Sequence, residues 1–402
     1  MKKKKILIIH HSGLIGGAGI SLYNTWMELE RKYTVVSYIP DDPPDLFNFL
    51  RDCGLDAHTF PFRLGKLTYY SGGNNLLKPR FWYHALHSLF QVRYWRRIIK
   101  DEKPDLVLVN SKVLCWMGKL FKTTKSLCFV RETIPGSPNK IMNRIMKNML
   151  EQFTAVAFLS EYDLRQTALN KAKTIVSPDF LVPGDYSDKL GREEACKRLK
   201  IDSNSFNVLF VGGIDTLKGI DVAVESMSFL KNEDVKLIVA GKDFGDISYN
   251  GLRTLPNIIK KRKSIKFSNR VKKYIKEEKI ENNIKFMGVQ TDMSLLFSAC
   301  DILIFPMKEA HQARPAFEIG VQKKPVIITD FDNISEFVQD GVNGLTFSKN
   351  DSKALAQSIL KLKNDTNLLK RLGNANYDCT MKYHTQGYAM GILINKIDEI
   401  LQ

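Results

Sequence analysis

The sequence predicts two α/β domains, each built on a parallel β-sheet with helices packed on its faces. The chain has 402 residues, a length at which a single hydrophobic core usually gives way to two. Short apolar runs alternate with longer helical stretches along the chain, which is typical of parallel sheets. We therefore expect a first domain at residues 1–185, a linker at 186–204 and a second domain at 205–380.

The composition fits a globular protein whose partners carry negative charge. The hydrophobic fraction is 44%, and no apolar run is long enough to cross a bilayer. The net charge of +17 favours polyanionic partners, which include nucleic acid, anionic lipid and phosphorylated substrates. The six cysteines have neither paired nor metal-like spacing, so we expect reduced thiols in a cytoplasmic protein.

The amino-terminal segment reads as the first strand, at Lys5–His10. Its apolar run, Ile6–Ile9, is too short for the core of a signal peptide. A loop with Gly16 and Gly17 follows, and we expect a helix at Ile20–Leu29. These glycines allow a ligand to approach the backbone, or they serve only a tight turn. The spacing G-x-G-x-x-G is absent, so we do not expect NAD binding.

Further strands are expected in the first half, and the polar residues that end one of them are candidates for a ligand site. Arg131 and Glu132 follow a strand directly, at the sheet edge where ligands bind in such folds. The expected strands are Thr34–Tyr38, Asp105–Asn110, Ser126–Arg131, Ala155–Ser160 and Thr174–Ser177.

A basic, aromatic helix is expected at residues 78–100. This stretch contains no acidic residue, and its apolar side chains recur at helical spacing beside several arginines. Such a helix suits an anionic membrane surface. The alternative is a helix packed on the sheet with solvated arginines. We favour membrane contact because tryptophan, tyrosine and arginine are dense here.

The second half opens with the run NVLFVGGIDTLKG, which predicts a strand, a glycine turn and a helix. Gly212 and Gly213 form the turn, and Lys218 lies at the start of the helix, where it could neutralise a diphosphate. A strand follows at Val235–Ala240, and then a strongly basic segment, 260–279, which is expected to be a solvated helix.

The stretch 299–347 contains the second set of candidate site residues. A strand at Asp301–Phe305 leads into a polar loop, and Pro315 suits the first turn of the next helix. Arg314 and Glu318 lie in that turn, where an arginine can bind phosphate and a carboxylate can accept bonds from ribose hydroxyls. The alternative is a helix that merely packs on the sheet.

Five motifs in the second half occur in an order and spacing similar to those of the retaining glycosyltransferases of family 4. They are GGIDTLKG, NIKFMGVQTD, SACDILIFP, RPAFEIGVQKKPVIITDF and DGVNGLTF. The resemblance implies the GT-B fold, in which two Rossmann-like domains face each other across a cleft. It also implies a last helix, within 381–402, that crosses back to the first domain. No metal is implied, and no cofactor beyond a UDP- or GDP-linked sugar as substrate.

The resemblance also assigns roles to individual residues. The family's diphosphate lysine corresponds to Lys218, and the second glutamate of its E-x7-E pair, on the ribose, corresponds to Glu318. We therefore nominate Lys218, Arg314 and Glu318 as catalytic residues and no protein nucleophile, because the departing phosphate takes the acceptor's proton. The expected donor-binding residues are Gly212, Gly213, Lys218, Glu309, His311, Gln312, Ala313, Arg314, Pro315 and Glu318.

The chain departs from the family pattern at three places. Gly213 stands where an arginine is usual, and Ala310 replaces the first glutamate of the pair, so Glu309 or His311 would have to contact the sugar. In the first domain Arg131 and Glu132 stand where a histidine is often found.

These observations lead to a transferase that uses a nucleotide sugar and a glycan or lipid-linked acceptor, in surface polysaccharide or glycolipid synthesis. We expect it at the inner face of the membrane, attached peripherally through residues 78–100. The alternative is a catalytically silent GT-B protein, which Gly213 and Ala310 favour. Nucleic-acid binding is not expected, because no known binding motif accompanies the charge.

Overall fold

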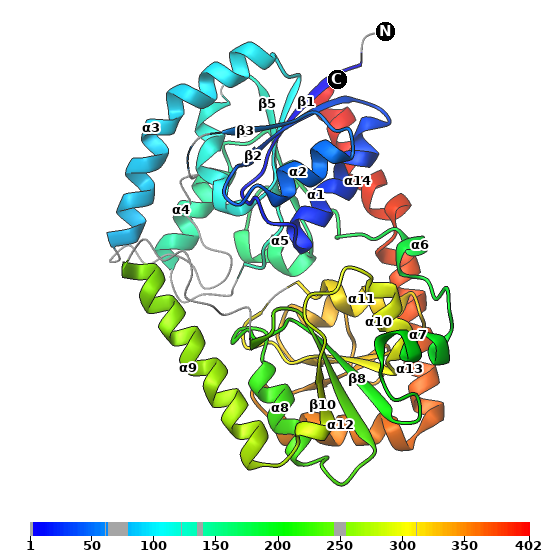
Figure 1. The fold of residues 1–402 in the computed structure, drawn as a ribbon. Helices are drawn as coiled ribbons and strands as arrows, with labels where there is room; N and C mark the ends of the chain where they lie inside the picture. Colours follow the sequence, from blue (N-terminus) through cyan, green and yellow to red (C-terminus); the bar gives the residue numbers. More distant parts are fainter. Residues whose placement is uncertain are drawn as a thin grey trace. The chain divides into compact units, whose positions relative to one another are not determined.

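The computed structural model divides the chain into two units, each with its own sheet and core (Figure 1). The first unit comprises Met1–Leu181 and Gln386–Gln402, and the second comprises Val182–Thr385. The structure describes residues 3–60, 62, 79–121, 123–134, 140–244, 255–310 and 312–402.

The first unit is a seven-stranded parallel sheet with the order β3-β2-β1-β4-β5-β6-β7. Its strands are β1 (Lys5–Ile9), β2 (Thr34–Pro40), β3 (Ala57–Phe60), β4 (Leu106–Val109), β5 (Lys125–Val130), β6 (Ala155–Phe158) and β7 (Thr174–Val176). Its helices are α1 (Gly17–Glu30), α2 (Asp45–Asp52), α3 (Pro79–Glu102), η1 (Lys112–Leu120), α4 (Lys140–Leu150), α5 (Glu161–Thr167), η2 (Lys171–Lys173) and α14 (Gln386–Leu401). The sequence analysis did not predict α2 and β3.

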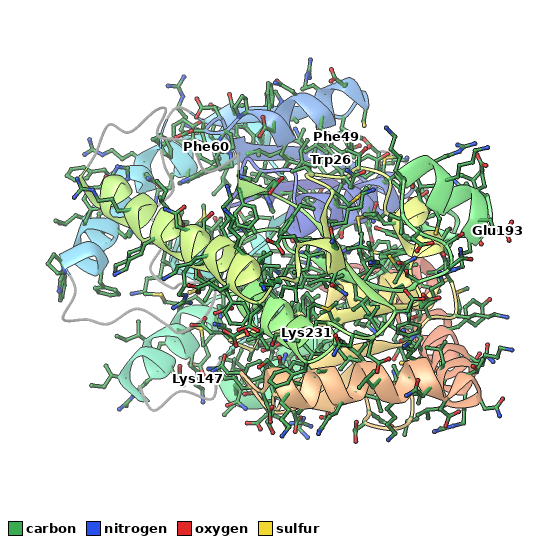
Figure 2. The ribbon with its side chains drawn as sticks, turned by 60° about the horizontal axis from the view of Figure 1, so that its bottom comes forward. Trp26, Phe49, Phe60, Lys147, Glu193 and Lys231 are labelled. Carbon is green, nitrogen blue, oxygen red and sulfur yellow. The ribbon has the colours of Figure 1, made fainter. Side chains whose placement is uncertain are left out.

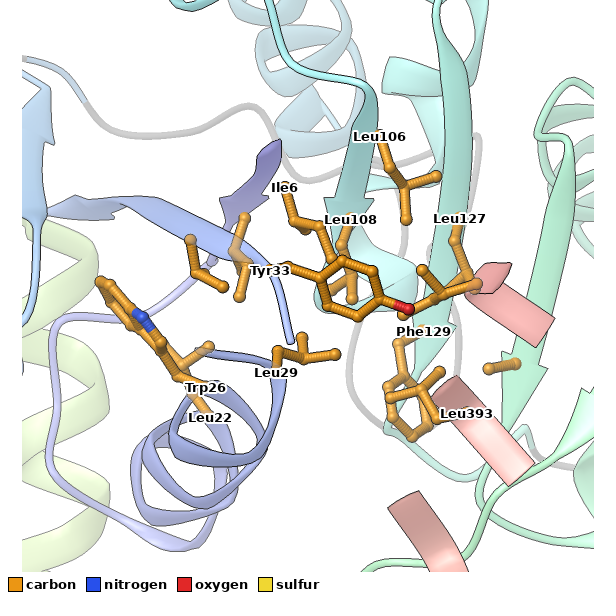
Figure 3. Close-up of a cluster of buried hydrophobic side chains, with 14 of the residues drawn as sticks. Ile6, Leu22, Trp26, Leu29, Tyr33, Leu106, Leu108, Leu127, Phe129 and Leu393 are labelled. Carbon is orange, nitrogen blue, oxygen red and sulfur yellow. The ribbon is translucent and has the colours of Figure 1, made fainter. Parts of the chain in front are cut away.

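Alternate residues of each strand enter cores on opposite faces of this sheet, as a pleated strand requires. In β1, Leu7 points to the face covered by α3, η1 and α4, and Ile6 to the face covered by α1, α2 and α14. Figure 3 shows the second of these cores, where Trp26 and Leu29 of α1 and Leu393 of α14 pack on the sheet.

The second unit is a six-stranded parallel sheet with the order β10-β9-β8-β11-β12-β13. Its strands are β8 (Phe206–Val211), β9 (Val235–Ala240), β10 (Ile284–Phe286), β11 (Ile302–Phe305), β12 (Val326–Thr329) and β13 (Gly344–Phe347). Its helices are α6 (Pro183–Tyr186), α7 (Arg192–Leu199), α8 (Ile220–Ser228), α9 (Leu255–Glu277), η4 (Glu281–Asn283), α10 (Met293–Ala299), α11 (Arg314–Gly320), η5 (Ile334–Glu336), α12 (Ser352–Asn364) and α13 (Thr366–Tyr383). Among the described residues, none of the helices in either unit combines the length and the apolar character that crossing a membrane requires.

The segment 186–204, which we predicted to be a linker, holds helix α7 and belongs to the second unit. Ala195 and Cys196 of α7 enter a core with residues of α10, β8 and β11, while Glu193 lies on the exposed side of the helix (Figure 2). The Arg192 guanidinium holds the helix against the sheet by an ion pair of 2.7 Å with Asp301. The polar composition of this segment therefore reflects surface exposure rather than a flexible connection.

The last helix, α14, completes the core of the first unit. Its residues Leu393 and Ile397 are fully buried in that core. The Ser177 hydroxyl donates to the carbonyl oxygen of Ala389 at 2.9 Å. Asp398 accepts a hydrogen bond of 2.8 Å from the Tyr33 hydroxyl and forms an ion pair with Lys32, so polar contacts also hold α14 to the end of α1.

Replacing Asp398 tests the docking of α14. We expect Asp398→Asn to lower the free energy of unfolding of the first unit by about 0.5–1.5 kcal/mol at neutral pH. Burial would raise the pKa of Asp398, but bonds from Lys32 and Tyr33 outweigh it and lower the pKa. The stabilisation is therefore present above the unfolded pKa of about 4 and is lost as the pH falls through the folded pKa.

The measurement is chemical denaturation followed by tryptophan fluorescence, because the four tryptophans of the chain all lie in the first unit. Glu399→Gln is the matched control. It removes a carboxylate from the same helix, but the Glu399 side chain is 68% exposed, so its ion pair with Lys396 should contribute little to stability. Equal stability of the Asp398→Asn variant and the control at neutral pH contradicts the docking role.

Candidate functional site

The candidate site lies at the carboxyl edge of the second sheet, where the strand order reverses between β8 and β11. The helix after β8, α8, packs on one face of the sheet, and the helix after β11, α11, packs on the other. Open α/β sheets bind ligands at such a point, because the two connections diverge there. The sequence-predicted residues Lys218 and Arg314 lie on these two connections.

Glycines let the connections at this edge approach one another at backbone distance. Gly219 has φ +77°, and a Cβ atom there would lie 1.7 Å from the carbonyl oxygen of Pro306. Gly213 has φ +60°, and a Cβ atom there would lie 2.4 Å from the amide nitrogen of Lys242. Gly213 therefore cannot be replaced by the arginine of the family pattern without a shift of the backbone.

Lys218 is half-buried above the end of β11. Its Nζ atom lies 5.3 Å from the centroid of the Phe305 ring. Burial lowers the pKa of Lys218, and the nearby Asp215 carboxylate opposes that shift. A partly desolvated ammonium group of this kind gains stability from an incoming anion.

Arg314 and Glu318, predicted to contact phosphate and ribose, contact each other. The Arg314 Nε atom donates to Glu318 Oε1 at 2.6 Å, one helical turn away. The Tyr186 hydroxyl donates to the same oxygen at 3.1 Å. Arg314 is 9% exposed and Glu318 is 7% exposed, so both residues are buried and little of either is accessible from the solvent. Burial and the Glu318 carboxylate raise the pKa of Tyr186 to about 12.

The helix α11 offers few backbone donors at its start. Among the four residues 313–316, Pro315 has no N–H group, and the Ala316 amide donates to the carbonyl oxygen of Ala313 at 2.8 Å. The helix has seven residues, so its dipole is small compared with the charge of a side chain. Side chains must therefore supply most of the positive charge at this edge.

The loop before α11 is tied to the loop before α8. The Lys308 amide donates to the carbonyl oxygen of Leu217 at 3.0 Å, and Lys308 Nζ forms an ion pair with Asp221. Glu309 is exposed and lines a cavity of about 640 Å³, together with residues of α8, α9 and the turn at 349–350. Gln312 is half-buried, and His311 lies outside the described residues.

The predicted ligand residues of the first unit form structural contacts. Arg131 is 8% exposed, its guanidinium lies 4.0 Å from the Phe129 ring, and it donates to Asn110, Ser21 and Thr25. These bonds tie the ends of β4 and β5 to α1. The guanidinium of Arg131 is therefore held by non-local bonds to the protein in this structure, and its contact with a ligand stays a prediction.

Glu132 also serves the protein, at the start of helix η1. Its Oε2 atom accepts from the Lys112 amide at 2.9 Å, and its Oε1 atom accepts from the Ser111 hydroxyl. The glycine turn is shorter than predicted. We expected the helix to begin at Ile20, and α1 begins at Gly17. A Cβ atom at Gly16 would meet nothing within 4 Å, so the backbone is open there.

Comparison with known proteins shows what the second unit is similar to. Residues 191–378, which make up most of this unit, match the family model described as glycosyl transferases group 1. An uncharacterized glycosyltransferase, MJ1178, of Methanocaldococcus jannaschii is 25% identical over 199 residues, which are 49% of this chain and 49% of that protein. The capsular polysaccharide biosynthesis glycosyltransferase CapM of Staphylococcus aureus is 25% identical over 182 residues, which are 44% of this chain and 41% of CapM.

The chain spans about half the length of the curated relatives it matches. Solved structures cover it fully and show its fold. Anabaena Alr3699/HepE, crystallised in complex with UDP, has a TM-score of 0.78 and 16% identity, covering 98% of this chain and 100% of that one. A glycosyltransferase from Rickettsia africae has a TM-score of 0.74 and 21% identity, covering 100% of both chains. The predicted GT-B fold with two Rossmann-like domains is therefore confirmed.

Two polar contributors at the sheet edges were missed by the sequence analysis. Tyr186 contacts Glu318 of the second unit from a segment that we predicted to be a linker. The two residues are 132 positions apart, so no local sequence pattern connects them. In the first unit, His10 lies at the end of β1 and is fully buried, with Nδ1 3.0 Å from the Asn110 side-chain nitrogen. A paired histidine directly after the first strand was the available signal.

Gly219→Ala tests the backbone approach that positions Lys218. We expect the substitution to destabilise the second unit by at least about 2 kcal/mol, because alanine would have to adopt a left-handed φ and its Cβ atom would clash with the carbonyl oxygen of Pro306. Calorimetry should show the loss, while tryptophan fluorescence, which reports the first unit, should be unchanged.

Gly184→Ala is the control, since a Cβ atom there meets nothing within 4 Å. A Gly219→Ala variant as stable as this control would show that Pro306 yields to the added methyl group at little cost.

Proposed function

We propose that this protein is a glycosyltransferase that moves a sugar from a nucleotide-diphosphate donor to a glycan or lipid-linked acceptor. The observation that carries the proposal is the position of Lys218. It lies where the strand order reverses between β8 and β11, in the unit that matches the glycosyl transferases group 1 model. UDP and UDP-glucose complexes of the similar Anabaena protein support a nucleotide sugar as the donor class.

In this proposal Lys218 neutralises the diphosphate. The ammonium group lies over the Phe305 ring with the Asp215 carboxylate nearby, and a phosphate oxygen of the donor would add a further negative charge against it. Charge developing on the leaving diphosphate is then met by a positioned cation, which stabilises the transition state. No residue at position 213 can contribute, because Gly213 is held against the backbone of Lys242.

Arg314 and Glu318 act as a pair in the proposed site. Arg314 and Tyr186 both donate to Oε1 of the Glu318 carboxylate. The carboxylate is thereby held in one orientation, and its second oxygen, Oε2, is proposed to accept from the ribose. Arg314 is proposed to hold Glu318 in place and to add positive charge near the phosphates.

The transfer is proposed to proceed with retention at the sugar and without a metal ion. The bond from the sugar to the diphosphate breaks, the acceptor oxygen attacks from the same face, and a diphosphate oxygen takes the acceptor's proton. In this course no protein side chain acts as a nucleophile.

The acceptor is proposed to belong to surface polysaccharide or glycolipid synthesis, which the likeness to CapM supports. Such an acceptor suits a cytoplasmic protein attached peripherally at the inner face of the membrane.

A silent nucleotide-binding protein on the same fold is the second candidate. It is favoured by Ala310, which has no group for a sugar hydroxyl, and by the mutual bond of Arg314 and Glu318.

Nucleotide binding is expected to depend on Lys218. Lys218→Met preserves much of the side-chain volume over Phe305 and removes the charge, so affinity for UDP or GDP should fall about tenfold or more. Isothermal titration measures it, with Lys231→Ala as the control because Lys231 is exposed (Figure 2). Equal affinity of Lys218→Met and wild type would sink the assignment.

The affinity of the wild type for UDP or GDP is expected to fall as the pH rises toward the usual lysine range of about 10.4. Burial lowers the pKa of Lys218, so the side chain loses its proton below its usual range of about 10.4. A bound diphosphate favours the protonated form, and affinity is lost as that form disappears. The Lys218→Met variant should show a flatter pH profile, measured by the same titration.

Turnover separates the two candidate functions. A panel of UDP- and GDP-sugars with membrane extract as acceptor, assayed with and without EDTA, should yield transfer that Lys218→Met and Glu318→Gln reduce at least tenfold. Binding of nucleotide without turnover of any donor favours the silent protein, and loss of activity with EDTA contradicts the metal-free course.

A further inference from the structure

We propose that the outer face of helix α3 attaches this protein to an anionic lipid surface. The outer face has an apolar half, formed by Trp82, Tyr83, Leu86, Leu89 and Phe90, and a basic half, formed by Arg93, Arg96, Arg97 and Lys100. The proposal concerns binding alone and does not depend on transfer activity.

The apolar half is strongly exposed. Trp82 and Tyr83 are each 59% exposed, Leu86 is 58%, Leu89 is 67% and Phe90 is 82%. Single exposed apolar residues are common on protein surfaces, but five large ones within nine consecutive residues of one helix form a continuous patch.

The exposed residues all lie on one side of the helix. At about 100° per residue, the nine positions of the outer face fall within an arc of about 140°. The buried residues Phe81, Ser88, Gln91 and Trp95 fall on the opposite side, toward the sheet. The sequence analysis treated the apolar side chains of this helix as one set at helical spacing. The structure divides them, because Trp82 is exposed and Trp95 is fully buried in the core.

The distribution of polarity on α3 is the reverse of that on a water-facing helix. Ser88 and Gln91 are 4% and 3% exposed, while Leu89 and Phe90 between them face outward. The Ser88 hydroxyl donates to the Ala85 carbonyl oxygen at 2.7 Å, and the Gln91 amide lies 2.7 Å from His87 Nδ1, so both buried polar groups are satisfied within the helix. The fold therefore accepts buried polar residues on the inner face while it leaves apolar ones outside.

Charge identifies the partner as anionic lipid. Residues 79–100 contain no acidic residue, and the net charge of the chain is +17. The next acidic residues in the sequence are Asp101 and Glu102, at the end of α3. Asp101 lies 3.4 Å from Arg97, and the Glu102 carboxylate accepts hydrogen bonds from Lys5 and Tyr38. Arg93, Arg96 and Lys100 thus form a basic group beside the apolar patch. A second copy of the chain would bring another net positive charge to this group, whereas lipid phosphates would neutralise it.

The two halves suit the two layers of a lipid interface. Apolar side chains of an interfacial helix enter the boundary between headgroups and acyl chains, and Trp and Tyr prefer that depth. Arginine and lysine one or two turns further along remain at the headgroups, where anionic lipid attracts them. The outer face of α3 has this order between Trp82 and Lys100.

Trp82 provides a direct test, because Trp26, Trp95 and Trp116 are buried and Trp82 is the exposed member of the four tryptophans. Vesicles of phosphatidylcholine and phosphatidylglycerol with brominated acyl chains should quench the fluorescence of the full-length wild type. Trp82→Phe should remove this quenching while the protein still sediments with the vesicles. Sedimentation without quenching, or quenching that persists in Trp82→Phe, overturns the proposal.

Sedimentation with the same lipids, unbrominated, separates the contributions of the two halves. Arg93→Gln/Arg96→Gln should weaken binding about tenfold or more at low salt, and Leu89→Ser/Phe90→Ser should weaken it at both low and high salt. The matched controls are Lys171→Gln/Lys173→Gln, which removes two exposed charges from the same unit, and Phe229→Ser, which removes an apolar side chain that is 54% exposed. Both controls should bind as wild type does.

Three results overturn the proposal. The first is that the wild type sediments with neither anionic nor neutral vesicles. The second is that the controls lose as much binding as the α3 variants. The third is a concentration-dependent dimer in analytical ultracentrifugation without lipid that Leu89→Ser/Phe90→Ser abolishes, which assigns the outer face to a second copy of the chain.

Discussion

The close backbone contact between Gly219 and Pro306 is the constraint on which the candidate site depends. It leaves no space for a side chain, so the turn after β8 has one arrangement relative to the end of β11. Lys218 is the residue before this contact, so its backbone is held near the end of β11, within reach of the Phe305 ring. A second contact, between Gly213 and the backbone of Lys242, holds the other end of the same turn. Position 213 is therefore a packing position in this chain.

The other half of the site has a different character, because its charges are satisfied internally. Arg314 and Glu318 neutralise one another across one helical turn, and Tyr186 adds a hydrogen bond from another helix. A buried ion pair of this kind contributes little net stability, since the desolvation of both charges offsets their attraction. Its value lies in orientation, because a carboxylate with one oxygen held by two donors presents the other in a defined direction.

Local sequence patterns predicted most of the fold, and non-local contacts account for most of what they did not predict. The strand β9 has the predicted bounds, since an apolar run ended by glycine identifies a buried strand. The helix α2 and strand β3 were missed because they are short and flanked by turn-forming residues. The bond between Arg314 and Glu318 has the spacing of a helical ion pair and was predictable from it. The bonds of Arg131 to Ser21 and Thr25 were not, because they cross more than a hundred residues of chain.

The return of α14 to the first unit has a consequence for synthesis of the chain on the ribosome. The core of the first unit includes Leu393 and Ile397, which are made after the whole second unit. The first unit therefore emerges with part of its apolar face uncovered, and it stays so while the second unit is translated, for roughly 10–40 s at about 5–20 residues per second. Because α14 follows the second unit in the sequence, the first unit starts to fold before the second unit is made and can finish only after it, and during that interval its open face is a part of the nascent protein that a chaperone would bind.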